Sequence, residues 1–249
     1  KHTSFNILMK VKLENPGMFS KIIEIISDLV TEVKIRINEE GLSINAIDPA
    51  NVAMIGFKIP KQAFSEFEVD NDSLGINLDD LKRILKRVSA NSSLILKREE
   101  NLLIIELEDR IKRRFSLNLI DIDTEEKEIP DLEFSSEVEL NSVDFISSIE
   151  DCNVVADACS FIINEKKFII ESKGINSARA EFSEDEAKIS AENCKSRYSL
   201  EYLQKFAKAS KLWDKTQLKF ANEHPLKMNI RTPNIQLSFL LAPRVETED

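Results

Sequence analysis

Glycine and histidine are scarce in this sequence, and their scarcity argues against several classes of site. The five glycines are too few and too scattered for a phosphate-binding P-loop or a G-x-G-x-x-G dinucleotide turn. The two histidines, His2 and His224, lie far apart in the sequence and lack the spacing of metal ligands. No nucleophile–base pair or carboxylate cluster suggests a reaction. We therefore expect no enzymatic activity, no catalytic residue, no cofactor and no metal site.

Cysteine and long apolar runs are also rare. The three cysteines, Cys152, Cys159 and Cys194, are an odd number without C-x-x-C spacing, which predicts buried, reduced thiols. No apolar run approaches the roughly 18 residues that a membrane span needs. The first residues contain no apolar core of the length found in signal peptides. We expect an intracellular protein that is not secreted, located in the cytoplasm or nucleoid, or in the nucleus of a eukaryote, with no membrane partner.

Acidic residues outnumber basic ones and give a formal net charge of −10. Taken over the whole chain, this balance argues against binding to nucleic acid, but only if the charge is evenly spread. The hydrophobic content of 42% and charged content of 31% are typical of a soluble globular protein. A length of 249 residues is enough for one large domain or two ordinary ones.

Segments of the first half recur in the second half, in the same order and at nearly the same spacing. The aligned pairs are 15–19 with 141–145, 77–87 with 199–209, and 111–117 with 235–241. Within them Phe19 falls on Phe145, Leu81 on Leu203 and Phe115 on Phe239. Identities are few and chance is the alternative, but the conserved order favours two homologous halves. The unit of repetition is a whole domain, not a short solenoid repeat.

Strand patterns dominate each half, with two helix patterns among them. In the first half, alternation of apolar and polar residues predicts strands at 5–13, 33–37, 42–46, 52–59, 64–69, 94–97, 102–107 and 113–120. Apolar residues at steps of three and four predict one helix that opens at Asn15 or Pro16 and a second over 79–88. The pattern suits an α+β fold of antiparallel sheets with the helices gathered on one face.

The second helix of each half has a basic face opposite its apolar stripe. The basic residues on 79–88 and on 199–215 are Lys82, Arg83, Lys86, Arg87, Lys205, Lys208, Lys211 and Lys215. A basic stripe on an isolated helix is usually a solvated face. Two such stripes at equivalent places in an acidic protein instead favour sequence-independent attraction to phosphates. No cluster suited to base readout accompanies them, so we expect contact with a nucleic-acid backbone alone.

The segment 41–60, GLSINAIDPANVAMIGFKIP, contains two strand patterns around an Asp-Pro turn. It resembles the signature segment of PCNA-type DNA sliding clamps. The resemblance runs essentially end to end and includes LGINLDDLKRILK at 74–86, LIDIDTEEKEIPDLEF at 119–134 and LAPRVETED at 241–249. It implies a clamp domain at 1–118, an interdomain connecting loop at 119–135 and a second clamp domain at 136–249. It also implies sheets outside and two helices per domain on the inner face of a ring.

The implied function is that of a processivity factor, which encircles double-stranded DNA and tethers DNA polymerase and other replication and repair enzymes. By resemblance, the residues facing DNA are Lys21, Lys82, Arg83, Lys86, Arg87, Lys205, Lys208 and Lys211. One departure is the helix near 142–152, which has Asp144, Glu150 and Asp151 and no basic residue. The alternative is a peptide-recruiting adaptor, or a checkpoint-type clamp, that does not act in replicative processivity.

The connecting loop is acidic, but it also holds apolar residues that a plain solvated linker does not explain. Its carboxylates, Asp121, Asp123, Glu125, Glu126 and Glu128, are better explained as a charged linker than as a weak cation site. In the family this loop passes over a front-face pocket for PIP-type peptides, Q-x-x-h-x-x-aromatic-aromatic, of polymerase, flap nuclease, DNA ligase and clamp loader. By position, the pocket residues are Ile47, Val52, Met54, Ile129, Pro130, Pro225, Leu240, Ala242 and Pro243.

Ring closure needs two different edges on each subunit. The resemblance places one edge at strand 111–118 and the other at 177–185, which meet head to tail between neighbouring subunits. The interface residues implied are Lys112, Arg113, Arg114, Arg179, Glu181 and Glu184. Opposed charges favour the pairing but contribute little unless they are partly buried. The ring is a homotrimer or a heterotrimer; the sequence leaves both open.

Overall fold

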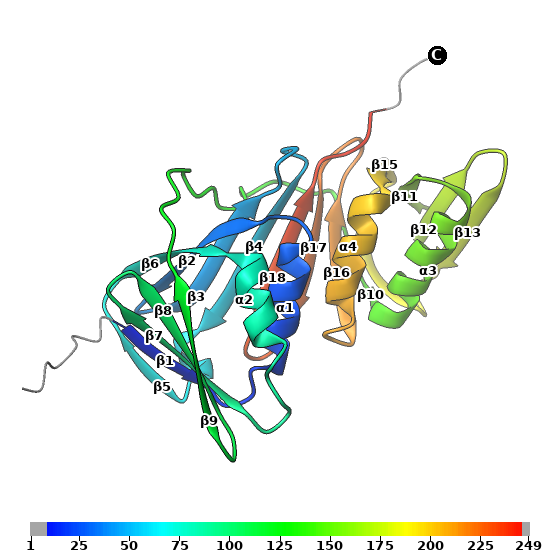
Figure 1. Cartoon of the computed structure of the whole chain (residues 1–249). Helices are drawn as coiled ribbons and strands as arrows, with labels where there is room; N and C mark the ends of the chain where they lie inside the picture. Colours follow the sequence, from blue (N-terminus) through cyan, green and yellow to red (C-terminus); the bar gives the residue numbers. More distant parts are fainter. Residues whose placement is uncertain (1–8, 246–249) are drawn as a thin grey trace, which may run out of the picture. The chain divides into compact units, whose positions relative to one another are not determined.

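The computed structural model describes residues 9–245. The helices are α1 (Gly17–Ser27), α2 (Leu78–Leu85), α3 (Ser142–Val155) and α4 (Leu200–Ser210), together with the short 3₁₀ helix η1 (Lys61–Ala63) (Figure 1). Strands of the first half are β1 (Met9–Leu13), β2 (Glu32–Asn38), β3 (Gly41–Ile47), β4 (Ala53–Pro60), β5 (Glu66–Val69), β6 (Asp72–Asn77), β7 (Ser93–Glu99), β8 (Leu102–Glu108) and β9 (Lys112–Asn118). Strands of the second half are β10 (Ser136–Asn141), β11 (Ala158–Asn164), β12 (Lys167–Lys173), β13 (Ser177–Phe182), β14 (Ala187–Ala191), β15 (Cys194–Ser199), β16 (Lys215–Phe220), β17 (Leu226–Arg231) and β18 (Gln236–Leu241). Within 9–245, no helix has both the length and the hydropathy to cross a membrane.

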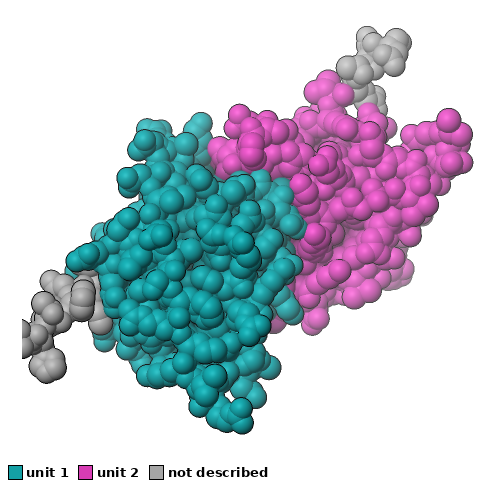
Figure 2. Space-filling view, viewed as in Figure 1, with its two compact units in different colours: residues 1–46, 56–128, 233–235 teal, residues 47–55, 129–232, 236–249 magenta. Residues whose placement is uncertain are grey.

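The chain divides into two compact units (Figure 2). Unit 1 contains residues 1–46, 56–128 and 233–235, and unit 2 contains 47–55, 129–232 and 236–249. The division cuts through β4, whose first residues, 53–55, belong to unit 2. The Asp-Pro turn and the start of β4 are therefore part of unit 2, although they precede most of unit 1 in the sequence.

The two halves of the chain have the same topology. Each runs through one strand, a helix, five strands, a second helix and three strands, apart from η1 in the first half. The sheet order β5-β1-β7-β8-β9 in the first half matches β14-β10-β16-β17-β18 in the second. Likewise β4-β3-β2-β6 matches β13-β12-β11-β15. This agreement supports the internal duplication that the sequence predicts.

Helices α1 and α2 of unit 1 lie side by side (Figure 1). The apolar stripe of α1 is buried, and its Phe19 ring stacks on Phe57 of β4 with centroids 6.3 Å apart. Asn77 caps α2, because its Oδ1 accepts from the backbone N–H groups of Asp79 and Asp80 at 3.0 and 3.2 Å. Leu81 and Leu85 of α2 are buried. Unit 1 thus buries two amphipathic helices and leaves their polar faces exposed.

Unit 2 is built around an aromatic cluster. Phe161 of β11 makes edge-on contacts with the rings of Phe145, Phe168, Tyr198 and Phe220, at centroid distances of 6.4, 5.6, 5.3 and 5.8 Å. All five side chains are fully buried. Such contacts between aromatic rings add to the free energy of burial. The cluster joins α3, the four-stranded sheet and β16 into one core.

The cysteines are buried, as predicted: Cys152, Cys159 and Cys194 are all buried and free. Cys152 ends the buried face of α3 and Cys159 lies near the start of β11. All three are part of the unit 2 core, where Cys194 Sγ lies 3.1 Å from Ser136 Oγ.

Several predicted element ends are wrong. The helix predicted over 79–88 ends at Leu85, because a serine-rich segment follows in which the Ser89 N–H donates to Ser92 Oγ at 3.1 Å. The helix predicted over 199–215 ends at Ser210, since Lys215 begins β16 and pairs with Asn141 of β10. Lys86 and Lys211 are the C-caps of these helices, so Arg87 and Lys215 lie outside them.

Strand predictions also need corrections. The strand predicted over 64–69 begins at Glu66, because the Phe64 N–H donates to the carbonyl oxygen of Lys61 and closes η1. Strand β6 was not predicted; it forms because it pairs with β2 along its whole length. The strand predicted at 177–185 ends at Phe182. Of the strand predicted at 5–13, residues 5–8 lie outside the described residues.

Candidate functional site

The Asp-Pro turn of unit 2 is fixed by the side chain that begins it. Asp48 is 5% exposed, and its Oδ1 accepts from the backbone N–H groups of Val52 and Ala53 at 2.8 and 2.9 Å. Its own N–H donates to the carbonyl oxygen of Ala53 at 3.0 Å. Asn51 has a φ of 57°, a left-handed conformation that asparagine tolerates. The turn is therefore a closed, internally bonded loop with a buried carboxylate at its centre.

The second oxygen of that carboxylate is bonded from a different element. Tyr202 of α4 donates its hydroxyl to Asp48 Oδ2. Burial acts to raise the pKa of Asp48, but hydrogen bonds from Ala53, Tyr202 and Val52 outweigh it and lower the pKa below its usual range. The hydrogen bond to Asp48, with burial, raises the pKa of Tyr202 to about 12. The pair is thus a carboxylate and a neutral phenol throughout the neutral range.

The predicted pocket residues all belong to unit 2. The Ala242 N–H donates to the carbonyl oxygen of Val52 at 3.0 Å, which brings the C-terminal segment against the Asp-Pro turn. Leu240 of β18 is 8% exposed. It pairs with Lys227 of β17, which lies two residues after Pro225 in the sequence. Ile47, Val52, Met54 and Pro243 are half-buried and Ala242 is exposed. The structure therefore brings Val52, Leu240, Ala242 and Pro225 together.

The end of the connecting loop lies beside this group. The ring of Phe134 meets His224 edge-on, with centroids 5.4 Å apart, and His224 directly precedes Pro225. Farther back in the loop, Ile129 is half-buried and Pro130 is exposed. Phe134 and His224 were not among the predicted pocket residues. An aromatic residue at the end of an acidic loop was the available signal for Phe134; none marked His224.

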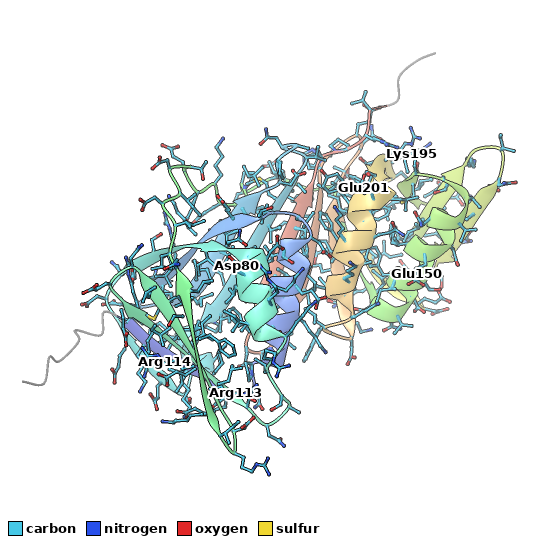
Figure 3. All side chains as sticks on the ribbon, viewed as in Figure 1. Asp80, Arg113, Arg114, Glu150, Lys195 and Glu201 are labelled. Carbon is cyan, nitrogen blue, oxygen red and sulfur yellow. The ribbon has the colours of Figure 1, made fainter. Side chains whose placement is uncertain are left out.

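The predicted DNA-facing residues lie on or just after three helices. Lys21 of α1 and Lys208 of α4 are exposed, and so are Lys86, Arg87 and Lys211 beyond the helix ends. On α2, Lys82 lies 3.8 Å from Asp79 and Arg83 is paired with Asp80, so part of the basic charge there is neutralised within the helix. Lys205 Nζ lies 5.7 Å from the ring centroid of Tyr202. The acidic Glu150 and Asp151 are exposed on α3, as the sequence suggests (Figure 3 labels Glu150).

Five of the six predicted interface residues lie on two strands at the ends of their sheets. Strand β9, which carries Arg113 and Arg114 (Figure 3), ends the five-stranded sheet, and β13 ends the four-stranded sheet. Arg114 is paired with Glu99 at 3.0 Å, and Lys112 with Glu108 at 3.1 Å. Arg179 is paired with Glu171 at 3.0 Å and Glu181 at 3.2 Å. Glu184 lies in the turn after β13, not on the strand, because β13 ends at Phe182 and the backbone turns at Ser183.

Unit 2 also contains a groove of about 750 Å³ between the start of α3 and the segment that follows α4. Trp213, which is 40% exposed, is among its lining residues, with Ser142 and Lys215. Ser142 Oγ is hydrogen-bonded to Thr216 Oγ1 at 2.9 Å, and Lys215 Nζ donates to Asn141 Oδ1 at 2.8 Å. Serine and lysine are therefore engaged elsewhere and form no nucleophile–base pair in this groove.

The fold defines a class: a duplicated α+β protein with antiparallel sheets and two helices in each half. Comparison with known proteins gives the family. The model of the proliferating cell nuclear antigen N-terminal domain matches residues 8–128, and that of its C-terminal domain matches 128–245. The chain therefore belongs to the proliferating cell nuclear antigen family of DNA polymerase sliding clamps, and the resemblance and fold class expected from the sequence are confirmed.

Archaeal relatives and a solved structure agree with this assignment. The chain is 35% identical to the DNA polymerase sliding clamp of Pyrococcus horikoshii and 38% identical to DNA polymerase sliding clamp 1 of Thermococcus kodakarensis. Each match covers 95% of this chain and 98% of the relative. The crystal structure of proliferating cellular nuclear antigen from Entamoeba histolytica has a TM-score of 0.90 at 24% identity, covering 96% of this chain and all of the other. A sliding clamp function is thereby favoured over the adaptor alternative.

Proposed function

We propose that the chain is one subunit of a trimeric ring that encircles double-stranded DNA and tethers replication and repair enzymes to it. The observation that carries the proposal is a pair of open sheet edges. Within unit 2, the residue that follows β18 is bonded to the residue that precedes β4, because the Ala242 N–H donates to the carbonyl oxygen of Val52 at 3.0 Å. By the internal repeat, β9 is the equivalent of β18 and β13 the equivalent of β4. By this equivalence, the same kind of junction can form between β9 of one copy and β13 of another, since each strand ends its sheet.

An open edge exposes unpaired backbone groups and pairs readily with another strand. If β9 of one subunit joins β13 of the next, a head-to-tail contact results. Such a contact closes into a ring when the rotation between subunits allows it. Three subunits of two domains each is the closed form that the family resemblance implies. The same chain can supply every subunit, because it has both edges.

In such a ring the basic residues of α1, α2 and α4 face the DNA backbone. The contact is electrostatic, weakened by salt and independent of base sequence. Retention comes from encirclement, so no tight DNA contact is needed. The acidic residues on α3 reduce attraction over that helix and leave most of the attraction to α2 and α4.

The pocket around Val52, Leu240 and Pro225 receives PIP-type peptides of clients, namely DNA polymerase, flap nuclease, DNA ligase and the clamp loader. Apolar side chains and prolines accept the aromatic anchors of such a peptide, while the connecting loop offers backbone groups along its length. The clamp gains its effect by raising the local concentration of the client at DNA. It performs no reaction itself, requires no cofactor or metal, and acts where the chromosome is: the cytoplasm and nucleoid, or the nucleus of a eukaryote.

Encirclement is tested by retention on circular DNA. We expect light scattering to give a particle of three times the monomer mass. Rings assembled on a closed circular plasmid should remain through a high-salt wash, because the salt removes only the electrostatic contact. Cutting the plasmid once should release them. Equal loss from the closed and the cut plasmid would contradict encirclement.

A further inference from the structure

We propose that Tyr202 is a positioning residue for the client-peptide pocket, acting through Asp48. This inference rests on the proposed peptide-binding function of the same site. Tyr202 lies in the first turn of α4, 154 positions from Asp48, and its hydroxyl donates to the buried carboxylate at the centre of the Asp-Pro turn. Both residues belong to unit 2, as do all the pocket residues. No other side chain has a hydrogen bond to Asp48 in the described part of the chain.

The two carboxylate oxygens of Asp48 accept different hydrogen bonds. Oδ1 accepts the N–H groups of Val52 and Ala53 and closes the turn, while Oδ2 accepts the Tyr202 hydroxyl. Because Asp48 is 5% exposed, removing the hydroxyl leaves Oδ2 largely shielded from water and without its donor. A buried acceptor that loses its partner is costly, and the carboxylate is then driven to rotate toward solvent. Rotation takes Oδ1 away from the two amides that define the turn.

The turn carries one wall of the pocket. Val52 contributes its side chain to the pocket, and its carbonyl oxygen accepts the Ala242 N–H of the opposite wall. Met54 follows Ala53, whose N–H is held by Asp48. A change in the position of Asp48 is therefore transmitted directly to both sides of the pocket.

Helix α4, which carries Tyr202, is packed into the core of unit 2. Leu203 and Phe206, which follow Tyr202 on the helix, are fully buried. The Phe206 ring stacks on Phe239 of β18 with centroids 4.5 Å apart, and the neighbouring Leu240 is a pocket residue. The helix that holds Tyr202 and the strand that holds Leu240 are thus packed together. Tyr202 ties the turn to this same packed group.

A pocket that is always in its binding geometry binds peptide more tightly than a pocket that adopts this geometry for only part of the time. The apparent dissociation constant rises in inverse proportion to the fraction of molecules with the competent turn. If loss of the hydroxyl leaves one molecule in ten competent, affinity falls about ten-fold. The hydroxyl itself does not touch the peptide, so its effect is on the population of the competent turn.

The test is calorimetric titration of the full chain with a Q-x-x-h-x-x-F-F peptide. We expect Tyr202→Phe to weaken binding about ten-fold. In the same variant, hydrogen exchange at the Val52 and Ala53 amides should accelerate. Ser172→Ala is the matched control, since it also removes one hydrogen-bonded hydroxyl of unit 2: Ser172 Oγ donates to the carbonyl oxygen of Ala158 at 2.8 Å. The control should lose thermal stability without losing peptide affinity or protection at residues 52 and 53.

A double-mutant cycle separates action through Asp48 from a direct contact. Asp48→Asn keeps the size of the side chain and an oxygen acceptor, and it is expected to weaken peptide binding. If Tyr202 acts only through Asp48, Tyr202→Phe combined with Asp48→Asn should bind no more weakly than the weaker single variant. If the loss of peptide affinity in the double variant equals the product of the two single losses, the proposal is overturned. Peptide affinity within two-fold of wild type in Tyr202→Phe would overturn it as well.

Failure of the pocket assignment is distinguishable from failure of this inference. An Ile129→Ala, Leu240→Ala double variant should lose peptide binding whatever Tyr202 does. Wild-type protein that binds no peptide overturns both the client pocket and the role of Tyr202. Binding that the double variant loses and Tyr202→Phe keeps overturns the role of Tyr202 alone.

Discussion

At the scale of single residues, Gly75 shows how the start of the connecting loop is held. A Cβ at this position would lie 1.9 Å from the carbonyl oxygen of Ile120. The Ile120 N–H also donates to the Gly75 carbonyl oxygen at 2.9 Å. Only glycine allows β6 and the backbone at Ile120 to approach this closely. The loop farther along is tied to β2, where Lys34 Nζ donates to the carbonyl oxygen of Thr124 at 3.0 Å.

We expect Gly75→Ala to destabilise the protein by about 1 to 3 kcal/mol, because backbone must move to admit the methyl group. Gly17→Ala is the control: a Cβ at Gly17 meets nothing within 4 Å. That control should be neutral, or stabilising by up to about 1 kcal/mol, through the lower entropy of the unfolded chain. Denaturant midpoints measure both. Equal midpoints for the two variants would show that the Gly75–Ile120 approach is not tight.

Residue-scale prediction from sequence succeeds where a bond is local. Aspartate in such a turn favours hydrogen bonds to nearby backbone, and Asp48 accepts from the N–H groups of Val52 and Ala53. The Tyr202 contact is not predictable in this way, because no local pattern joins residues 154 positions apart. The same holds for Phe134 against His224, which meet only when β16 and β17 bring their connecting segment to the end of the loop.

At the scale of elements, apolar periodicity locates the helices but not their ends. The stripe of α4 continues to Leu212, yet the helix stops at Ser210, whose hydroxyl accepts from Thr216 Oγ1 at 2.9 Å. The pairing of β16 with β10 sets the end of the helix, because Lys215 pairs with Asn141 of β10. Likewise β6 forms through pairing with β2, although its sequence reads as the approach to a helix. Tertiary pairing sets these boundaries, and a single sequence does not reveal it.

The basic face of α4 leads to a prediction about salt. We expect Lys205→Gln with Lys208→Gln to flatten the slope of log K against log salt for duplex DNA by about two units per subunit, if both contact phosphates. Lys188→Gln with Lys195→Gln is the control, because these exposed lysines lie on the strands β14 and β15 and not on a helix. Fluorescence anisotropy with a labelled duplex, at several salt concentrations, gives the slopes. An unchanged slope in the α4 variant would place DNA elsewhere.

At the scale of the whole molecule, duplication predicts assembly better than charge does. The charged residues of β9 and β13 that were predicted to lie at the subunit interface already have partners within the same chain. Arg113 Nη2 lies 3.6 Å from Asp109 Oδ2 and donates to the carbonyl oxygen of Arg87 at 3.1 Å, while Glu181 is paired with Lys167 at 2.8 Å. Exposed pairs of this kind contribute about 0 to 1 kcal/mol each. The larger contribution expected at the subunit boundary is therefore backbone pairing between edge strands, with charge selecting the partner.

Arg113→Glu with Arg114→Glu should weaken ring assembly, because it places negative charge opposite Glu181 of the next subunit. The expected result is a shift from trimer toward monomer at low micromolar concentration in light scattering. Lys195→Glu is the control, since it reverses charge on β15, at the opposite end of the sheet from β13. This control should remain trimeric.

A loss of assembly can also come from damage to β9 itself, because Arg114 is paired with Glu99 of β7. Compensation separates the two causes. Adding Glu181→Arg and Glu184→Arg to the same chain restores opposite charges across the boundary without restoring the Arg114–Glu99 pair. Recovery of the trimer in this four-residue variant would show that β9 meets β13 of a neighbouring copy. A monomer in both variants, with thermal stability equal to that of wild type, would instead show that β9 meets an edge other than β13.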